Sequence, residues 1–150
     1  MHNNKMNDTN TLLDELVKFQ RKKMASSKKL SFTDMKRVCK YINTSIFNNQ
    51  NCSLWQGYIT NNDHPEKGIY INFYFKGKKV ALHRILYINY VDNLDNDEYL
   101  KYECENIGKC CNINHFKKFK YKRAESGIEE NPIEKNNIEI IDNNLDITFD

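Results

Sequence analysis

The chain has 150 residues, of which 39% are hydrophobic and 29% charged, and its formal net charge is +3 at pH 7. This length allows one core with extensions, and the polar composition keeps that core modest. No run approaches 18 apolar residues and the first thirty lack a signal-peptide core, which argues against a membrane span and predicts a soluble, intracellular protein. Five cysteines in such a protein favour reduced thiols and metal binding over disulfides.

Charge is divided unevenly along the chain. Residues 124–150 hold eight acidic residues and one basic residue, which gives −7, so the other 123 residues carry +10. A basic body suits a polyanion such as nucleic acid, although solvated lysine faces produce the same surplus in many proteins.

Two amphipathic helices are predicted near the N-terminus, after a patternless stretch at residues 1–10 that we expect to be disordered. The first begins at Thr11 and follows an apolar stripe to about residue 24. The second begins after Ser31 or Thr33, either of which can cap it. Its stripe consists of Met35, Val38, Cys39, Ile42 and Ile46. Cys39 is therefore interpreted as a core residue and not as a ligand.

Short strands are predicted next. Residues 54–60 form one candidate strand, and residues 68–82 form a hairpin in which Ile71, Phe73 and Phe75 alternate with polar or tyrosine residues and Lys76-Gly77-Lys78 supplies the turn. An aromatic ribbon of this kind fits the major groove of B-DNA, which is about 12 Å wide. Burial of both of its faces explains the same pattern equally well.

The next elements are a helix over residues 83–92, a strand over residues 98–103 and a short helix over residues 114–123. Basic residues crowd the last of these helices: Lys117, Lys118, Lys120, Lys122 and Arg123.

Residues 101–122 combine cysteines, a histidine and basic residues in one short unit. Cys104, either Cys110 or Cys111, and His115 are ligand types that hold zinc, and Cys52 is a fourth candidate. The spacing C-x5-C-x4-H lacks the paired C-x2-C knuckles of the commonest zinc fingers. Buried or free thiols beside a surface histidine account for it equally well.

Three segments, CSLWQGY, KGKKVALHRILYINY and YECENIGKCCNINHF, resemble the zinc-stapled HNH or His-Me-finger (ββα-metal) superfamily in their order and spacing. Phage HNH and intron homing endonucleases belong to it, and the SMAD DNA-binding domain is a non-catalytic relative. The resemblance implies a structural Zn²⁺ on Cys52, Cys104, Cys110 and His115, because the family's Asn follows its ligand cysteine by two residues, as Asn112 follows Cys110. It also implies that Arg84 of the His-Arg pair can reach a phosphate.

The implied fold is α+β, with two N-terminal helices before a small zinc-binding domain made of a β-hairpin and a ββα finger. The expected divisions are a disordered segment at 1–10, a helical extension at 11–50, the His-Me-finger-like domain at 51–124 and an acidic tail at 125–150.

The catalytic positions of the family are not kept in this chain. Lys101 and Tyr102 stand where nucleases carry the Asp-His or Ser-His pair whose histidine activates water, and a tyrosine with a pKa of about 10 is a poor base near neutral pH. Ala124 stands where the family binds catalytic magnesium, and Glu125 is the only oxygen ligand nearby. The resemblance therefore implies a surviving zinc staple without the nuclease chemistry.

We accordingly expect a non-catalytic, zinc-containing nucleic-acid-binding protein, an inactive endonuclease fold with double-stranded DNA as its foremost partner. The expected contacts are Arg84 and the basic residues of the last helix. One alternative is a zinc-held scaffold in a larger assembly, whose N-terminal helices or acidic tail meet a protein partner. Another is a residual nuclease that uses Glu125, His83 or His64. The expected location is nuclear, or with a viral or organellar genome.

Overall fold

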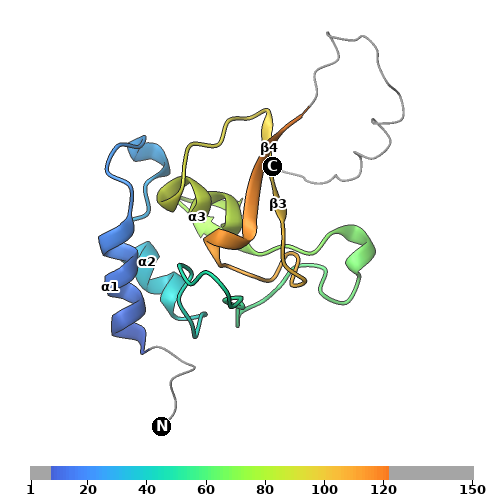
Figure 1. The fold of residues 1–150 in the computed structure, drawn as a ribbon, viewed down its shortest axis with the longest axis horizontal. Helices are drawn as coiled ribbons and strands as arrows, with labels where there is room; N and C mark the ends of the chain where they lie inside the picture. Colours follow the sequence, from blue (N-terminus) through green and yellow to red (C-terminus); the bar gives the residue numbers. More distant parts are fainter. Residues whose placement is uncertain (1–7, 122–150) are drawn as a thin grey trace.

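The computed structural model describes residues 8–121, which form a small α+β fold of three α-helices and two antiparallel hairpins (Figure 1). In chain order these elements are α1 (Thr9–Phe19), α2 (Phe32–Cys39), β1 (Asn72–Phe75), β2 (Lys78–Ala81), α3 (Leu82–Tyr90), β3 (Glu98–Tyr102) and β4 (Phe116–Lys120). Short 3-10 turns occupy Ser26–Lys28, Pro65–Lys67 and Ile113–His115. No helix within residues 8–121 is long and apolar enough to cross a membrane.

Side-chain caps define the start of both N-terminal helices. The Asp8 carboxylate accepts from the backbone N–H of Asn10 at 2.8 Å, and Ser31 and Asp34 form a reciprocal capping box on α2. The predicted second helix was too long, because α2 ends at Cys39. Ile46 is still buried, but its carbonyl accepts from the backbone N–H of a distant residue, Ile113. The predicted stripe therefore identified core positions correctly beyond the end of the helix.

The predicted first hairpin is confirmed, and only one of its faces is buried. Phe73 and Phe75 point into the core, whereas Tyr74 between them is 58% exposed. Lys76 and Gly77 form its two-residue turn with φ values of 50° and 82°, the left-handed backbone that such tight hairpins require. The predicted strand at residues 54–60 does not form, and the segment makes only isolated bridges there.

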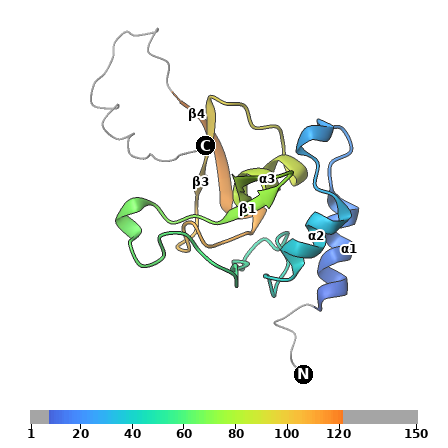
Figure 2. The ribbon, with the colours of Figure 1, turned by 180° about the vertical axis from the view of Figure 1, so that it is seen from behind.

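Helix α3 lies at the centre of the molecule. Figures 1 and 2 show α1 and α2 on one side of it and the β3–β4 hairpin on the other. Seven of its nine residues are buried, so nearly its whole circumference is covered. One continuous hydrophobic cluster joins Leu12 of α1, Trp55 of the long loop, Phe73 of β1 and Leu86 of α3. The N-terminal helices and the first hairpin thus pack around a shared core.

A fully buried asparagine, Asn89, connects α3 to the segment between α1 and α2. Its side-chain oxygen accepts from the Nε2 of Gln20 at 2.8 Å and from the backbone N–H of Leu30 at 2.9 Å. Its amide nitrogen donates to the carbonyls of Lys28 and Ile85 at 2.9 and 2.8 Å. All four hydrogen-bonding positions of the amide are filled, as burial demands.

The predicted helix at residues 114–123 is wrong for the part of the chain that the structure describes. Residues 116–120 form β4, which pairs with β3 so that Glu98 lies opposite Lys120 and Tyr102 opposite Phe116. The helical portion before it is a single 3-10 turn. The phenylalanines of Phe-Lys-Lys-Phe-Lys are three residues apart, a helical spacing, so local pattern did not predict the strand, which forms by pairing with β3. Lys122 and Arg123 lie outside the described residues, as does the predicted acidic tail.

Replacing Asn89 by Ala should lower the free energy of unfolding by about 2–4 kcal/mol, because the buried backbone N–H of Leu30, the carbonyl of Lys28 and the side chain of Gln20 would lose a partner at once. Urea denaturation followed by circular dichroism measures this value. Asn62→Ala is the matched control, since Asn62 is exposed and should change stability by less than about 0.5 kcal/mol. A similar effect of both substitutions would contradict the assigned role.

Candidate metal centre

Four side chains that are distant in sequence meet on one side of the fold. The ligand atoms of Cys52, Cys104, Cys110 and His115 all lie within 4.8 Å of one another. Cys52 comes from the loop after α2, the other two cysteines from the loop after β3, and His115 from the end of the 3-10 turn before β4. The predicted ligand set is therefore brought together, and it could bind a metal ion such as zinc.

The distances in this cluster fit a tetrahedral zinc site. With Zn–S bonds of about 2.3 Å and Zn–N bonds of about 2.0 Å, a tetrahedron places sulfur and nitrogen about 3.5 Å apart. The Nδ1 atom of His115 lies 3.4 Å from the sulfur of Cys52 and 3.5 Å from that of Cys110. Nδ1 is thus the nitrogen that faces the site. Four protein ligands would leave no open position for substrate or water, as in structural zinc sites.

Hydrogen-bond donors surround the sulfur atoms. The backbone N–H of Asn112 donates to the sulfur of Cys110 at 3.3 Å, and the side-chain amide of Asn106 donates to that of Cys52 at 3.2 Å. Burial nevertheless raises the pKa of Cys110 to about 12, and burial also raises the pKa of Cys104. Because the thiolate is the form that binds metal, a cation is needed to bring these groups to their deprotonated state at neutral pH.

Asn112 holds the two ligand-bearing loops together. It is fully buried, and its amide nitrogen donates to the carbonyls of Asn48 and Asn51 at 2.6 and 2.8 Å. Two backbone hydrogen bonds add to this connection, one from Cys111 to Ser53 and one from Trp55 to Lys109. The loop that carries Cys52 is therefore fixed against the loop that carries Cys110.

The role of Asn106 was not predicted, although the chain contains a signal for it. Asn106 follows Cys104 by two residues, just as Asn112 follows Cys110, so the Cys-x-Asn pattern occurs twice. In both copies the backbone N–H of the asparagine points at the preceding cysteine sulfur and lowers the thiol pKa against the effect of burial. The repeated pattern therefore marks sulfur atoms whose thiolate form is stabilised by a backbone N–H donor.

The two remaining cysteines are core residues. Cys111 is 1% exposed and belongs to the hydrophobic cluster, where burial raises its pKa well above the usual value. Cys39 lies in α2 against the same core, and burial raises its pKa to about 11. Neither belongs to the four-residue cluster.

Tyr102, at the position matched to the nuclease base, is half-buried and contacts two rings. The imidazole of His83 stacks on it with ring centroids 5.3 Å apart, and Phe116 packs edge-on against both rings. Burial raises the pKa of Tyr102 well above 10. Burial, together with the charge of Arg84, lowers the pKa of His83 to about 3. Both side chains are therefore neutral near pH 7. Ala124 and Glu125 lie outside the described residues.

The predicted nucleic-acid contact residues that the structure describes make internal contacts. Arg84 donates to the carbonyl of Glu98 at 3.2 Å. On β4, Lys117 lies 3.9 Å from a carboxylate oxygen of Glu103 and Lys120 lies 3.7 Å from one of Asp97. Exposed ion pairs of this kind are weak, so they leave both lysines able to exchange partners.

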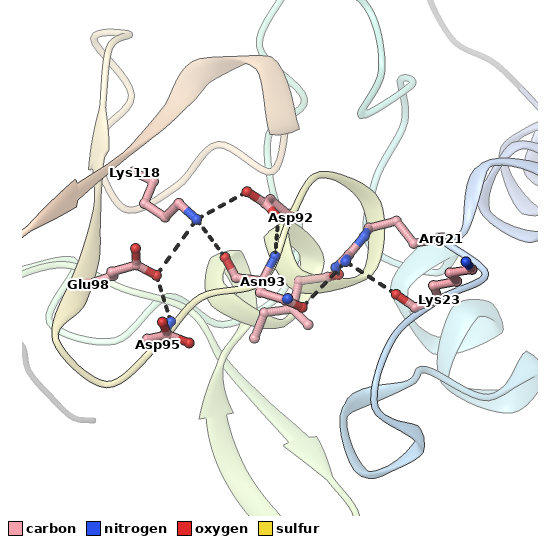
Figure 3. A network of polar contacts seen from close by, with 8 residues as sticks. Arg21, Lys23, Asp92, Asn93, Asp95, Glu98 and Lys118 are labelled. Atoms are coloured by element: carbon pink, nitrogen blue, oxygen red, sulfur yellow. Dashed lines mark hydrogen bonds and ion pairs between the residues drawn. The ribbon is translucent and has the colours of Figure 1, made fainter.

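Lys118 is held more firmly, in the network shown in Figure 3. Its ammonium group contacts the carboxylates of Asp92 and Glu98 at 3.1 and 3.7 Å and donates to the carbonyl of Asn93 at 2.9 Å. The Asn93 side chain accepts from Arg21, which connects the network to the segment after α1. Lys118 therefore anchors β4 to the segment that follows α3.

One relative bears directly on the chain. The chain is 49% identical over 128 residues to "Uncharacterized protein R328" of Acanthamoeba polyphaga mimivirus. The alignment covers 85% of this chain. The aligned part spans only 37% of that protein's length. No known family profile and no solved structure matches the chain.

Purified, folded protein should contain about one equivalent of zinc. Cys110→Ser should release the metal and unfold, because structural zinc can contribute about 10–16 kcal/mol to folding at neutral pH. Elemental analysis and circular dichroism measure the two effects. Less than half an equivalent of zinc in folded wild-type protein would contradict this prediction.

Cys111→Ala is the matched control for the metal ligand. It removes a neighbouring buried sulfur without adding a hydroxyl group to the apolar cluster, as serine would. We expect full zinc content and a decrease of about 1–2 kcal/mol in unfolding free energy.

Proposed function

We propose that this chain is a non-catalytic, zinc-containing nucleic-acid-binding module of the His-Me-finger type. The observation that carries the proposal is the location of the charge surplus. Residues 22–40 contain seven basic residues and one acidic residue, and residues 76–79 add three lysines. Lys76 donates to the carbonyl of Ser26 at 3.1 Å, which brings the tip of the first hairpin against that segment. We call these ten basic residues the basic region.

The basic region differs from β4 in how its charges are balanced. Among its ten members only Arg37 has a carboxylate of residues 8–121 within 4.0 Å, that of Asp34. The three lysines of β4 all have such a carboxylate. Unbalanced positive charge attracts phosphates and releases their counterions on binding, which favours association with nucleic acid of any sequence. This difference favours the basic region over β4 for contacts with the phosphate backbone of a duplex.

The candidate metal centre supports a role without catalysis. Its four protein ligands leave the ion without a free position, and Tyr102 has a raised pKa that prevents it from acting as a base. A zinc ion bound there would supply structural stability only.

A scaffold within a larger assembly is the second candidate. It is favoured by the internal ion pairs of the β4 lysines and by two exposed apolar side chains on α1, Val17 at 50% and Phe19 at 46% exposure. The salt dependence of nucleic-acid binding separates the two candidates. A nucleic-acid-binding module should lose affinity as salt rises, with a slope set by the lysines that contact phosphates, whereas a scaffold should show no such binding.

Lys40→Gln combined with Lys78→Gln should weaken binding to a DNA duplex and reduce the slope of log affinity against log salt. Each phosphate that the variant no longer neutralises lowers that slope by about 0.9 on duplex DNA. Gel shifts at several salt concentrations measure it. The matched control, Lys18→Gln with Lys67→Gln, removes the same charge outside the basic region. Equal slopes for both variants, or no salt-dependent binding, would favour the scaffold.

The purified protein should not cleave DNA. Nicking of supercoiled plasmid in the presence of Mg²⁺ or Mn²⁺ is the direct measurement, with a known nuclease as positive control. Cleavage that disappears on His83→Ala or Glu125→Gln would overturn the non-catalytic assignment and establish a residual nuclease.

A further inference from the structure

The β3–β4 hairpin has an outer face that turns away from α3. In an antiparallel pair, residues directly opposite each other share a face, so Tyr99 with Phe119 and Lys101 with Lys117 lie on the same side. The other side carries Tyr102 and its neighbours, which pack on His83 of α3. The outer face thus consists of one aromatic row and one lysine row.

The aromatic row is continuous and open to solvent. The rings of Tyr99 and Phe119 are stacked with centroids 5.7 Å apart and planes 26° apart, and Tyr121 extends the row with its centroid 4.7 Å from that of Tyr99. Phe119 is 40% exposed. Near-parallel rings on neighbouring strands whose centroids lie this far apart are offset, so part of each ring is left uncovered and another flat ring can stack there.

The lysine row carries an electrostatic cost that a ligand would relieve. Lys101 and Lys117 are direct cross-strand partners, and like charges in that position destabilise a sheet. Glu103 lies 3.9 Å from Lys117, but both side chains are at least half exposed, so the pair offsets little of this repulsion. The ammonium of Lys101 rests 5.5 Å from the centre of the Phe119 ring. An anion bound between the two lysines would neutralise both.

The spacing of the rows matches a ligand that is both anionic and aromatic. Adjacent rows on one face of a strand are two residues, or about 7 Å, apart. A nucleotide can place its phosphate on the lysine row and its base on the aromatic row. Bases in a duplex are already stacked on one another and present only their edges, whereas those of a single strand can turn onto an aromatic side chain.

We propose that the outer face of the β3–β4 hairpin binds single-stranded nucleic acid, with bases stacked on Tyr99 and Phe119 and phosphates at Lys101 and Lys117. This inference rests on the proposed function and names a second, structurally distinct contact surface for it. The basic region would bind any phosphate backbone, and the hairpin would add a preference for unpaired strands.

Binding of a fluorescein-labelled 12-nucleotide single-stranded DNA and of the corresponding duplex to the full-length, zinc-loaded chain tests the inference by fluorescence anisotropy. Tyr99→Ala with Phe119→Ala should weaken single-strand binding about tenfold or more and leave duplex binding within twofold. Tyr99→Phe with Phe119→Tyr should retain binding, because it keeps both rings. Tyr58→Ala removes an exposed ring elsewhere and should have no effect.

The outcomes separate the two proposals. If the wild-type chain binds neither oligonucleotide, the proposed function fails and this inference fails with it. If the chain binds both, but the alanine pair weakens neither or both equally, only this inference is overturned. Zinc content and circular dichroism confirm that each variant is folded.

Discussion

The closure of the Cys52, Cys104, Cys110 and His115 cluster is the constraint on which the rest of the structure depends. Between α2 and β1 the chain runs for more than thirty residues with only isolated bridges and one 3-10 turn. So long a loop gains little from its own hydrogen bonds and must be fixed by tertiary contacts. Asn112 and the backbone bonds to Ser53 supply some of these. A metal ion would join the same two loops with a far larger free energy than any single hydrogen bond.

The β3–β4 hairpin depends on this arrangement because a two-stranded ribbon is only marginally stable by itself. Its inner face packs on α3 through the His83–Tyr102 stack, and Lys118 connects β4 to the carboxylates of Asp92 and Glu98. The candidate metal ligands Cys104 and His115 lie just beyond the last pair, Tyr102 and Phe116. The ribbon is thereby held near its middle by Lys118 and at one end by the candidate metal cluster and the His83–Tyr102 stack.

Features of the fold and of the candidate site could be predicted where they depend on residues close together in the sequence, and were missed where they depend on contacts between distant segments. The candidate metal cluster could be anticipated because cysteine and histidine are zinc-ligand types and because the family resemblance selected Cys52 and Cys110. The first hairpin could be predicted because its alternation and its Lys76-Gly77-Lys78 turn are local signals. Strand β4 was missed because its pairing partner lies in a distant segment, and its lysines suit an exposed helix equally well. Asn89 gave no signal at all, since three of its four partners lie in the segment between α1 and α2, about 60–70 residues away in the sequence. The predicted stripe of α2 located Ile42 and Ile46 in the core but not the helix end, because burial does not require helical backbone.

Because the candidate metal site has no open coordination position, the residues that carry the function must be sought on the surface. An ion with four protein ligands cannot meet a substrate, and the nearby ionisable rings of His83 and Tyr102 are neutral. Surface charge alone does not distinguish a binding face from a solvated one. The distinction lies in whether each positive side chain has a carboxylate beside it. The β4 lysines have carboxylates beside them, whereas almost all of the basic region has none among residues 8–121.

Lys101 and Lys117 form an intermediate case. They lie opposite each other beside exposed rings, and only Lys117 has a carboxylate nearby, that of Glu103. Repulsion of this kind raises the energy of the free protein, and a bound phosphate would lower it, so the two lysines favour an anionic ligand more than their number suggests.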